Sequence, residues 1–365
     1  MLVLGGYGTF GARVAERLAR MAGVEVIVAG RSEAKAQACA ASLAQSAKAR
    51  VCGLRLDAGD ASAAVLGAIE PAVLINATGP FQDQDYRLAR ACIEARVHYV
   101  DLADAPGFVT GITVLDADAR RAGVLVASGA STVPALSAAV VDAYAGKLCS
   151  LRAVSTTIAP ANSFDPGIAT TRSILGSLGK PLAAPGRPVG QGRHGWQGLQ
   201  RCSLPGLGVR WRSLCEVPDL DLFPQRYPGL QDVKVYAALE VSAFHLGLWG
   251  LSWVVRAGLV RRPQRVAGVL RALKRRLGFL GSDRGGMVMT LDGRDADDRP
   301  TRVTWHLVAG SGHGPYIPAI PSVLLARRLL DGTLVARGAM PCMGLFTLDE
   351  FLAELADLDV AAGAA

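Results

Sequence analysis

The fold is decided by the first eleven residues, MLVLGGYGTFG (residues 1–11). The first apolar residues predict a short strand, and residues 9–21 predict the helix that follows it. Gly6, Gly8 and Gly11 have the G-x-G-x-x-G spacing. We expect Gly6 to permit a tight turn, Gly8 to let the backbone approach a pyrophosphate, and Gly11 to let the helix pack closely. The stretch therefore predicts a dinucleotide-binding loop at a helix N-terminus, the alternative being a glycine turn that binds nothing.

The end of the next predicted strand, residues 24–29, indicates which dinucleotide is bound. An NAD site usually has an acidic residue about 20 positions past the glycines. Here Arg31 stands twenty positions after Gly11. A guanidinium pairs with a 2′-phosphate through two hydrogen bonds, and Ser32 adds a hydroxyl. We therefore predict NADP(H), with NAD(H) as the less favoured cofactor. In the alternative interpretation Arg31 faces solvent and Glu33 reaches the ribose.

The first half of the chain alternates short apolar runs with helical patterns, which is typical of a parallel sheet with crossover helices. The predicted strands are residues 2–4, 24–29, 51–56, 73–76, 99–102 and 124–127. We therefore predict an α/β protein that begins with a Rossmann doubly wound parallel sheet.

The pattern changes after a predicted exit helix at residues 135–148. Strands at 151–158, 288–291 and 301–308 are separated by long glycine- and proline-rich connections, which predicts a mainly antiparallel sheet in an α+β domain. Residues 320–330 and 348–356 look helical. We predict an NADP(H)-binding domain over 1–134, a substrate domain over 135–314, and C-terminal helices over 315–365 that pack back on the first domain, with substrate between the domains.

Composition narrows the class of protein. The 365 residues carry a net charge of +8, and residues 256–276 alone hold eight basic residues and no acid. The rest is close to neutral, so a nucleic-acid-binding protein is not expected. The seven cysteines are scattered without C-x-x-C spacing, and the glycine loop follows Met1 closely, so we expect no disulfide framework, no metal site, no signal peptide and a cytoplasmic location. We also expect a homodimer.

Residues 241–280 combine an uncharged run with a basic segment. Residues 241–255 are apolar but too short for a comfortable membrane span. Apolar residues from Val266 to Leu280 then recur at helical spacing, with cations predicted on the other face. We interpret the segment as a buried hairpin followed by a helix with a solvated basic face. The alternative is a peripheral contact with the inner face of the membrane.

Further loops lie at strand C-termini, where such sheets bind ligands. Asp57 is placed to accept from the adenine amino group, or is simply a turn aspartate. Residues 76–81 place amides and small side chains beside the cofactor, or form only a proline turn. Residues 128–134 follow the sixth strand. The predicted cofactor-binding residues are Gly6, Tyr7, Gly8, Thr9, Phe10, Gly11, Arg31, Ser32, Asp57, Asn76, Ala77, Thr78, Gly79, Pro80, Phe81 and Ser131.

These loops resemble one known family. The glycine loop, the A-G-R at residues 29–31, N-A-T-G-P-F at 76–81 and H-Y-V-D-L at 98–102 are similar to the saccharopine dehydrogenase/reductase-like family. The C-terminal Gly314-Pro315-Tyr316 and the turn at residues 338–341 fit as well. The resemblance implies a Rossmann domain, an inserted second domain and NAD(P)H-linked reduction. Many relatives have carbonyl, imine or enoyl substrates, and some relatives are associated with lipid. Relatives often have G-x-D-S-x-P where this chain has Ser131, so a role for that carboxylate is not carried over.

Catalytic residues are less clearly marked. Hydride transfer belongs to the nicotinamide, so the protein supplies orientation and one proton donor. Polar residues among glycines in the second domain and near the C-terminus are the candidates, each of which is alternatively a turn or surface residue. The predicted catalytic residues are His194, Tyr316, Asp165, Asp283 and Arg284.

The sequence thus predicts an NADP(H)-dependent oxidoreductase that reduces a C=O, C=N or activated C=C bond of a small substrate. The apolar run around Trp249 and Trp253, beside the basic segment, favours a hydrophobic or lipid-like substrate. Two alternatives are a catalytically silent NADPH-binding sensor and a peripheral lipid-binding protein.

Overall fold

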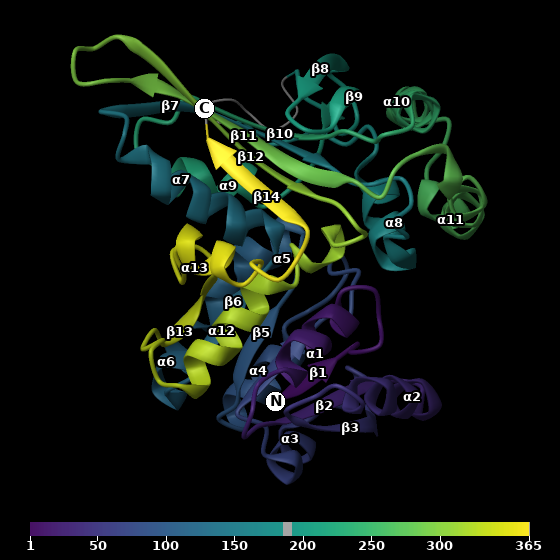
Figure 1. Cartoon of the computed structure of the whole chain (residues 1–365), viewed down its shortest axis with the longest axis vertical. Coiled ribbons are helices and arrows are strands. Elements are labelled where there is room, and N and C mark those ends of the chain that lie inside the picture. Colours follow the sequence, from purple (N-terminus) through teal and green to yellow (C-terminus); the bar gives the residue numbers. More distant parts are fainter. Residues whose placement is uncertain (185–191, 365) are drawn as a thin grey trace. The chain divides into compact units, whose positions relative to one another are not determined.

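The computed structural model describes residues 1–184 and 192–364, which form two compact units (Figure 1). Unit 1 comprises Met1–Leu136 and Pro315–Phe346, and unit 2 comprises Ser137–Gly314 and Thr347–Ala365. Each unit is therefore built from two separate stretches of the chain.

Unit 1 contains a seven-stranded sheet in which every described pair of neighbouring strands is parallel. The order β13-β6-β5-β4-β1-β2-β3 contains the doubly wound arrangement 3-2-1-4-5-6, with β13 added at one edge (Figure 1). Its strands are β1 (Leu2–Leu4), β2 (Glu25–Gly30), β3 (Arg50–Arg55), β4 (Val73–Asn76), β5 (His98–Asp101), β6 (Leu125–Ser128) and β13 (Gly338–Pro341). The predicted Rossmann fold is confirmed.

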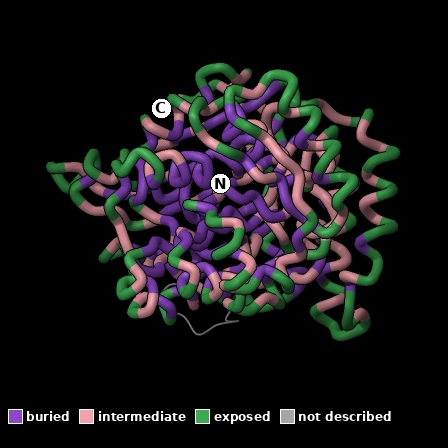
Figure 2. The backbone as a smooth tube through the Cα atoms, turned by 90° about the horizontal axis from the view of Figure 1, so that it is seen from below, coloured by how far each residue is buried: buried purple, intermediate pink, exposed green. Residues whose placement is uncertain are grey.

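The inner strands of this sheet are continuous apolar runs because helices cover both faces. Leu2–Leu4 and Val73–Asn76 are buried at every position, and Figure 2 shows buried residues gathered in the interior. α12 contacts α1, β4 and β5, so residues far along the chain complete the core of unit 1. The helices are α1 (Gly11–Ala19), α2 (Glu33–Ala44), α3 (Ala63–Ile69), α4 (Arg87–Glu94), α5 (Pro106–Gly111), α6 (Asp116–Ala122) and α12 (Ile320–Leu330).

Unit 2 contains a second seven-stranded sheet, of order β14-β12-β11-β7-β10-β9-β8 among the described residues. Among the strands that the structure describes here, only β7 and β10 pair in parallel, so the predicted mainly antiparallel second sheet is confirmed. Its strands are β7 (Ser150–Ala159), β8 (Gln200–Leu204), β9 (Gly208–Leu214), β10 (Asp232–Ala237), β11 (Gly285–Arg294), β12 (Pro300–Ala309) and β14 (Val360–Ala364).

Helices of unit 2 pack on the sheet and on one another. α7 contacts β7 and β11, and α9 contacts β10, so they cover the apolar side of the sheet. α8, α10 and α11 surround the buried Trp196. None of the helices in the described chain has the length and apolarity needed to cross a bilayer. The helices are α7 (Ser137–Ala145), α8 (Gly167–Ser177), α9 (Asp219–Arg226), α10 (Ser242–Arg256), α11 (Ala267–Arg276) and α13 (Leu348–Ala353).

Three expectations about local structure differ from what is observed. The expected hairpin at 241–255 is the helix α10, because Leu248, Leu251 and Val255 recur at helical spacing and pack near Trp196. The expected turn at 338–341 is the strand β13, which pairs with β6.

The third difference concerns the C-terminal segment. The sequence placed all of residues 315–365 with the first domain. Residues 315–346 do lie in unit 1, but residues 347–365 lie in unit 2, because α13 packs on α7 and β14 pairs with β12.

Candidate functional site

The glycine loop joins β1 to α1 and is tied to the neighbouring strand. The backbone N–H groups of Gly5 and Gly6 donate to the carbonyl oxygen of Ala29, at 2.8 and 3.0 Å. Gly5 has a φ of +77°, in the left-handed region, so Gly5 makes the tight turn. From the sequence, Gly6 was expected to make it. Gly6 is needed for another reason, since an added Cβ would lie 2.8 Å from the carbonyl oxygen of Val3.

The other two glycines differ in how crowded they are. A Cβ on Gly11 would lie 2.2 Å from the carbonyl oxygen of Gly5, so α1 begins in direct contact with the loop. A Cβ on Gly8 would have one neighbour within 4 Å, the carbonyl oxygen of Gly5, at a distance of 3.0 Å. The close helix packing predicted for Gly11 therefore has a geometric cause, and the backbone at Gly8 is open to an approaching ligand.

Tyr7 links the glycine loop to the end of β2, a contact that the sequence did not reveal. Its hydroxyl oxygen accepts a hydrogen bond from the backbone N–H of Ser32 at 2.9 Å. Its ring lies against Gly30, where an added Cβ would approach Tyr7 Cε1 to 2.5 Å. Ser32 is also the N-cap of α2, because its Oγ accepts from the backbone N–H of Lys35 at 3.4 Å.

Arg31 extends from this junction as an exposed side chain with no ion pair to any residue that the structure describes. The alternative ribose ligand, Glu33, is engaged along α2, where its Oε1 accepts from Gln37 Nε2 at 3.0 Å. The cation therefore stands available at the end of β2, while the carboxylate already has a partner on its own helix.

The loop after β4 lies against the glycine loop. A Cβ on Gly5 would come within 3.0 Å of the backbone of Ala77, and the Ala77 N–H donates to the carbonyl oxygen of Leu4 at 2.9 Å. The side chain of Asn76 is buried and turned inward, accepting from the Thr78 N–H at 3.0 Å. Phe81 is a core residue, with its ring 5.3 Å from that of Phe108.

Two further predicted residues serve their own turns. Asp57 Oδ1 accepts from the backbone N–H of Gly59 at 3.1 Å, as the turn alternative expected. The backbone N–H of Ser131 donates to the carbonyl oxygen of Gly129 at 2.8 Å, within the loop that follows β6. Both lie where the carboxyl ends of the strands meet, since β1 to β6 run parallel.

A buried aspartate beneath these loops was missed by sequence reasoning. Asp101 ends β5, is fully buried, and holds the start of the loop after β6. Its Oδ1 accepts from the N–H groups of Gly129 at 2.8 Å and Ala103 at 3.0 Å, and from the Ser128 hydroxyl at 3.0 Å. Burial raises the pKa of Asp101 to about 6, against the opposing effect of these hydrogen bonds.

The neighbours of Asp101 extend this network along the edge of the sheet. Asn76 Nδ2 donates to the Tyr99 hydroxyl oxygen at 3.0 Å, and burial raises the pKa of Tyr99 well above its usual value. The Cys342 N–H donates to the carbonyl oxygen of Ser128 at 2.7 Å. The ends of β4, β5, β6 and β13 are therefore joined by one polar network.

The donor set at this edge fits NADP(H). A pyrophosphate needs close backbone amides and a helix N-terminus, which the open Gly8 and the start of α1 supply. A 2′-phosphate needs a cation, which Arg31 supplies without competition from Glu33. The residues present therefore match the negative charges of this dinucleotide.

The predicted catalytic residues are divided between the two units. Tyr316 lies in unit 1, where its hydroxyl donates to Glu16 Oε2 at 2.7 Å beneath the Arg13 guanidinium. Burial and the adjacent Glu16 carboxylate raise the pKa of Tyr316 to about 12. The tyrosine is thus a tightly held hydrogen-bond donor to a carboxylate.

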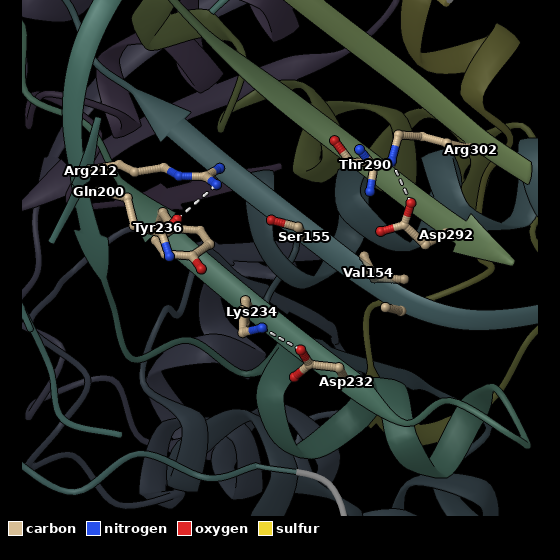
Figure 3. Close-up of a pocket in the computed structure, with 11 residues that line it drawn as sticks. Val154, Ser155, Gln200, Arg212, Asp232, Lys234, Tyr236, Thr290, Asp292 and Arg302 are labelled. Atoms are coloured by element: carbon tan, nitrogen blue, oxygen red, sulfur yellow. Dashed lines mark hydrogen bonds and ion pairs between the residues drawn. The ribbon is translucent and has the colours of Figure 1, made fainter. Parts of the chain in front are cut away.

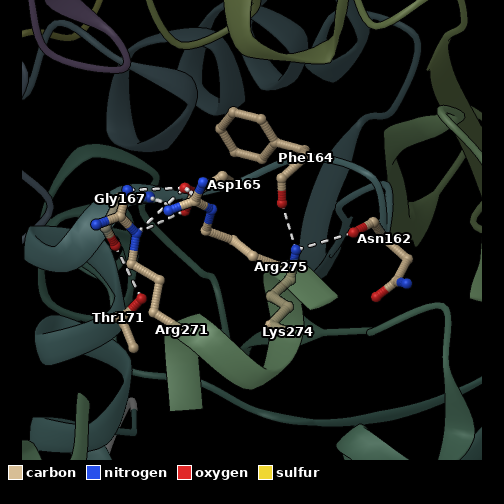
Figure 4. Close-up of polar contacts among 8 residues, drawn as sticks. All are labelled: Asn162, Phe164, Asp165, Gly167, Thr171, Arg271, Lys274 and Arg275. Carbon is tan, nitrogen blue, oxygen red and sulfur yellow. Dashed lines mark hydrogen bonds and ion pairs between the residues drawn. The ribbon is translucent and has the colours of Figure 1, made fainter. Parts of the chain in front are cut away.

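Asp165 is an ion-pair partner in unit 2. Arg271 Nε and Nη2 hold its two carboxylate oxygens, at 2.8 and 2.7 Å, and Arg275 lies 3.8 Å away (Figure 4). The hydrogen bond from Arg271 lowers the pKa of Asp165. Asp165 is therefore ionised at neutral pH and clamps α11, which is a structural contact.

The remaining candidates are also in unit 2. His194 pairs with Pro181 in an isolated bridge, and burial lowers its pKa. Asp283 and Arg284 are exposed in the turn before β11, where the Arg284 N–H donates to Ser282 Oγ at 3.1 Å.

A cavity of about 280 Å³ lies on the polar face of the sheet in unit 2 (Figure 3). Most of its polar side chains are engaged with one another. Arg302 bonds Asp292 and Lys234 bonds Asp232, whereas Arg212 contacts the neutral side chains of Gln200 and Tyr236. We assign this hollow no ligand.

Comparison with known proteins gives a family match for the N-terminal part of the chain and likenesses to solved structures over its whole length. Residues 1–140 match the model of the saccharopine dehydrogenase NADP binding domain. The fold resembles saccharopine dehydrogenase (L-Glu forming) from Saccharomyces cerevisiae, with a TM-score of 0.68 and 14% identity over 100% of this chain and 99% of that one.

A second solved structure is less similar. Amine dehydrogenase from Mycobacterium smegmatis has a TM-score of 0.48 and 13% identity, over 96% of this chain and 94% of that one. Among curated proteins, no sequence matches the chain.

Proposed function

Residues 1–140 belong to the saccharopine dehydrogenase NADP-binding domain family, so the protein is an NAD(P)-dependent oxidoreductase, and we propose that it reduces a C=O, C=N or activated C=C bond of a small hydrophobic substrate. The observation that carries the cofactor assignment is Arg31 at the end of β2, which is exposed and has no ion pair with any described residue. NADP(H), with NAD(H) less favoured, is the cofactor.

The proposed cofactor site uses the edge already described. The backbone of residues 6–11 holds the pyrophosphate and Arg31 the 2′-phosphate, while residues 76–81 and Ser131 line the nicotinamide half. The bound nicotinamide supplies hydride transfer. Asp101 acts below them as a positioning residue, because it fixes the Gly129 amide and the Ser128 hydroxyl.

The test is the selectivity for NADPH over NADH, measured by fluorescence titration. Arg31→Ala is expected to weaken NADPH binding about 10-fold to 100-fold, because it removes a charge-assisted pair, and to leave NADH binding unchanged. Arg50→Ala is the matched control, an exposed arginine at the opposite end of the neighbouring strand β3. Equal affinity of the parent protein for NADPH and NADH would contradict the assignment.

The proposal of a hydrophobic or lipid-like substrate is supported by the apolar residues of α10, among them Trp249 and Trp253, beside the basic segment. NADPH oxidation is measured with apolar ketones, imines and enoyl compounds and with free 2-oxo acids. We expect turnover only with the apolar compounds. Turnover confined to the small polar acids would contradict this part of the proposal.

His194 is the proton-transfer residue that we carry forward from the five candidates. Its lowered pKa keeps the ring neutral at pH 7, so that it accepts a proton in the oxidative direction. We expect His194→Gln to lower kcat with little change in NADPH affinity, whereas His306→Gln, a histidine within strand β12, leaves kcat unchanged. Asp165, Asp283, Arg284 and Tyr316 are secondary proposals.

The alternative is a catalytically silent NADPH-binding sensor, in which the site binds NADPH but the protein reduces no substrate. Tight NADPH binding with no oxidation by any compound of the panel would favour it. The expected homodimer stays a prediction, which light scattering tests. The peripheral membrane contact through residues 241–280 also stays a proposal, and its surface is specified next.

A further inference from the structure

The basic segment of unit 2 lies in a lobe formed by α10, α11 and the short 3-10 turns η3 (Pro263–Val266) and η4 (Gly278–Leu280). The inner side of this lobe is well packed. Leu251 and Val255 of α10 and Leu270 of α11 pack around Trp196 and against α8. The lobe is therefore a fixed part of unit 2 with a defined outer side.

The outer side of α11 is apolar, which reverses the orientation expected from the sequence. Val266, Val269 and Leu273 follow one helical face, and Val269 is 71% exposed and Leu273 46% exposed. Phe279, beyond the helix end, is 78% exposed. Nine of the thirteen exposed large hydrophobic residues of the described chain lie within residues 246–280, so the apolar exposure is concentrated in this lobe.

Four of the eight cations of the lobe have partners in unit 2, among them Arg256, which donates to Gln197, and Arg275, which pairs with Asp165. The inner cations hold the structure, since Arg271 pairs with Asp165 and Lys274 donates to the carbonyl oxygens of Asn162 and Phe164 (Figure 4). The outer cations are exposed and have no ion pair with any residue of the described chain. They are Arg261, Arg262, Arg265 and Arg276.

The segment that forms this surface contains no acidic residue. Between Glu240 and Asp283 the sequence contains eight basic residues and no acidic one. Arg265 and Arg276 lie on the same helical face as Val269, so positive charge and apolar side chains occupy one surface. A partner must therefore be anionic and also offer an apolar interior.

We propose that the outer face of residues 259–280 docks on an anionic lipid bilayer. Val269, Leu273 and Phe279 enter the boundary between headgroups and acyl chains, and the outer arginines bind lipid phosphates. A nucleic acid would leave the exposed apolar side chains without a role, and a second copy of this surface would oppose cations to cations. This inference is independent of the catalytic proposal, since it concerns a surface distinct from the edge that holds the cofactor.

The experiment is flotation of the full chain, without cofactor, with vesicles of phosphatidylcholine alone or mixed with phosphatidylglycerol. We expect binding only to the anionic vesicles, weakened by added salt. Arg265→Glu with Arg276→Glu is expected to lower partitioning by at least roughly fivefold per arginine. Val269→Ser with Leu273→Ser is expected to lower it by about tenfold or more, because both lose apolar contact.

The matched controls are the same kinds of substitution at exposed positions outside residues 259–280. Arg201→Glu with Arg299→Glu alters the net charge equally, and Val114→Ser with Val335→Ser removes two exposed valines from unit 1. An unchanged melting curve shows that each variant is folded, together with unchanged tryptophan fluorescence for the variants in unit 2 and retained NADPH binding for the variant in unit 1.

Two outcomes overturn the proposal. One is equal binding to neutral vesicles, or an equal loss of binding in the controls. The other is a lipid-free dimer that Val269→Ser with Leu273→Ser converts to monomer, since the face would then be an interface between copies. Neither outcome affects the cofactor assignment, which the Arg31 titration tests separately.

Discussion

Two aspartates, one in each unit, show how the same residue type is used in opposite ways. Asp101 is fully buried at the edge of the parallel sheet, where amides and a hydroxyl hold it and burial raises its pKa to about 6. Asp165 is about one third exposed, and the hydrogen bond from Arg271 lowers its pKa. Asp101 thus organises the loops of the cofactor edge, whereas Asp165 pairs with a cation to hold a helix.

The first way to test this contrast is to disturb the edge around Asp101 at its most crowded glycine. Gly11→Ala places a Cβ 2.2 Å from the carbonyl oxygen of Gly5, so the loop must move. We expect unit 1 to lose about 3 kcal/mol of stability and NADPH binding to be lost. Gly67→Ala in α3 is the control, because its Cβ meets no atom within 4 Å and alanine favours a helix. Normal NADPH affinity of Gly11→Ala would contradict the tight packing at the loop.

The second prediction removes the buried carboxylate. Asp101→Ala leaves the buried Gly129 and Ala103 amides without an acceptor, so we expect a loss of about 2 kcal/mol, measured by urea unfolding with NADPH binding as the probe of unit 1. Asp101→Asn is the matched control, because the hydrogen bonds from Ala103, Ser128 and Gly129 all fall on Oδ1, which an amide oxygen can replace. If both variants lose the same stability, the hydrogen bonds are not what Asp101 contributes.

The third prediction concerns pH. The pKa of Asp101 is higher in the folded protein than in the unfolded chain, so its neutral form is the stabilising one. That stability is present below about pH 4 and is lost as the pH rises through about 6.

The matched comparison is again with Asp101→Asn, in which this dependence is absent. The stability of Asp101→Asn relative to the parent is expected to rise between pH 4 and pH 6, by up to about 1.4 kcal/mol per pH unit. Asp219, whose pKa burial raises to about 7, has the same sign but is present in both proteins, so its contribution cancels. A difference that stays flat with pH would show that the pKa of Asp101 is not raised in the folded protein.

The sequence predicted the parts of the molecule that depend on local patterns. The strands at 2–4 and 73–76 and the helix at 320–330 have the bounds expected, because apolar runs and helical spacing are local signals. Asp101 was missed because it ends a buried strand and its partners Ser128 and Gly129 are 27 and 28 residues away. The outward apolar face of α11 was missed because periodicity shows that a helix has two faces but not which one is buried.

The last prediction, and the smallest effect, concerns Asp165. Asp165→Asn keeps the shape of the side chain and removes the charge that pairs with Arg271, so we expect a loss of about 1 kcal/mol or less, because the pair is partly exposed to water. All five tryptophans lie in unit 2, so tryptophan fluorescence during urea unfolding reports this loss directly. Asp297→Asn, which breaks an exposed pair with Arg299, is the control and should change nothing measurable. A large loss of kcat in Asp165→Asn at unchanged stability would contradict the contrast with Asp101. It would indicate that Asp165 is a catalytic residue, because the loss of a purely structural ion pair is not expected to change turnover.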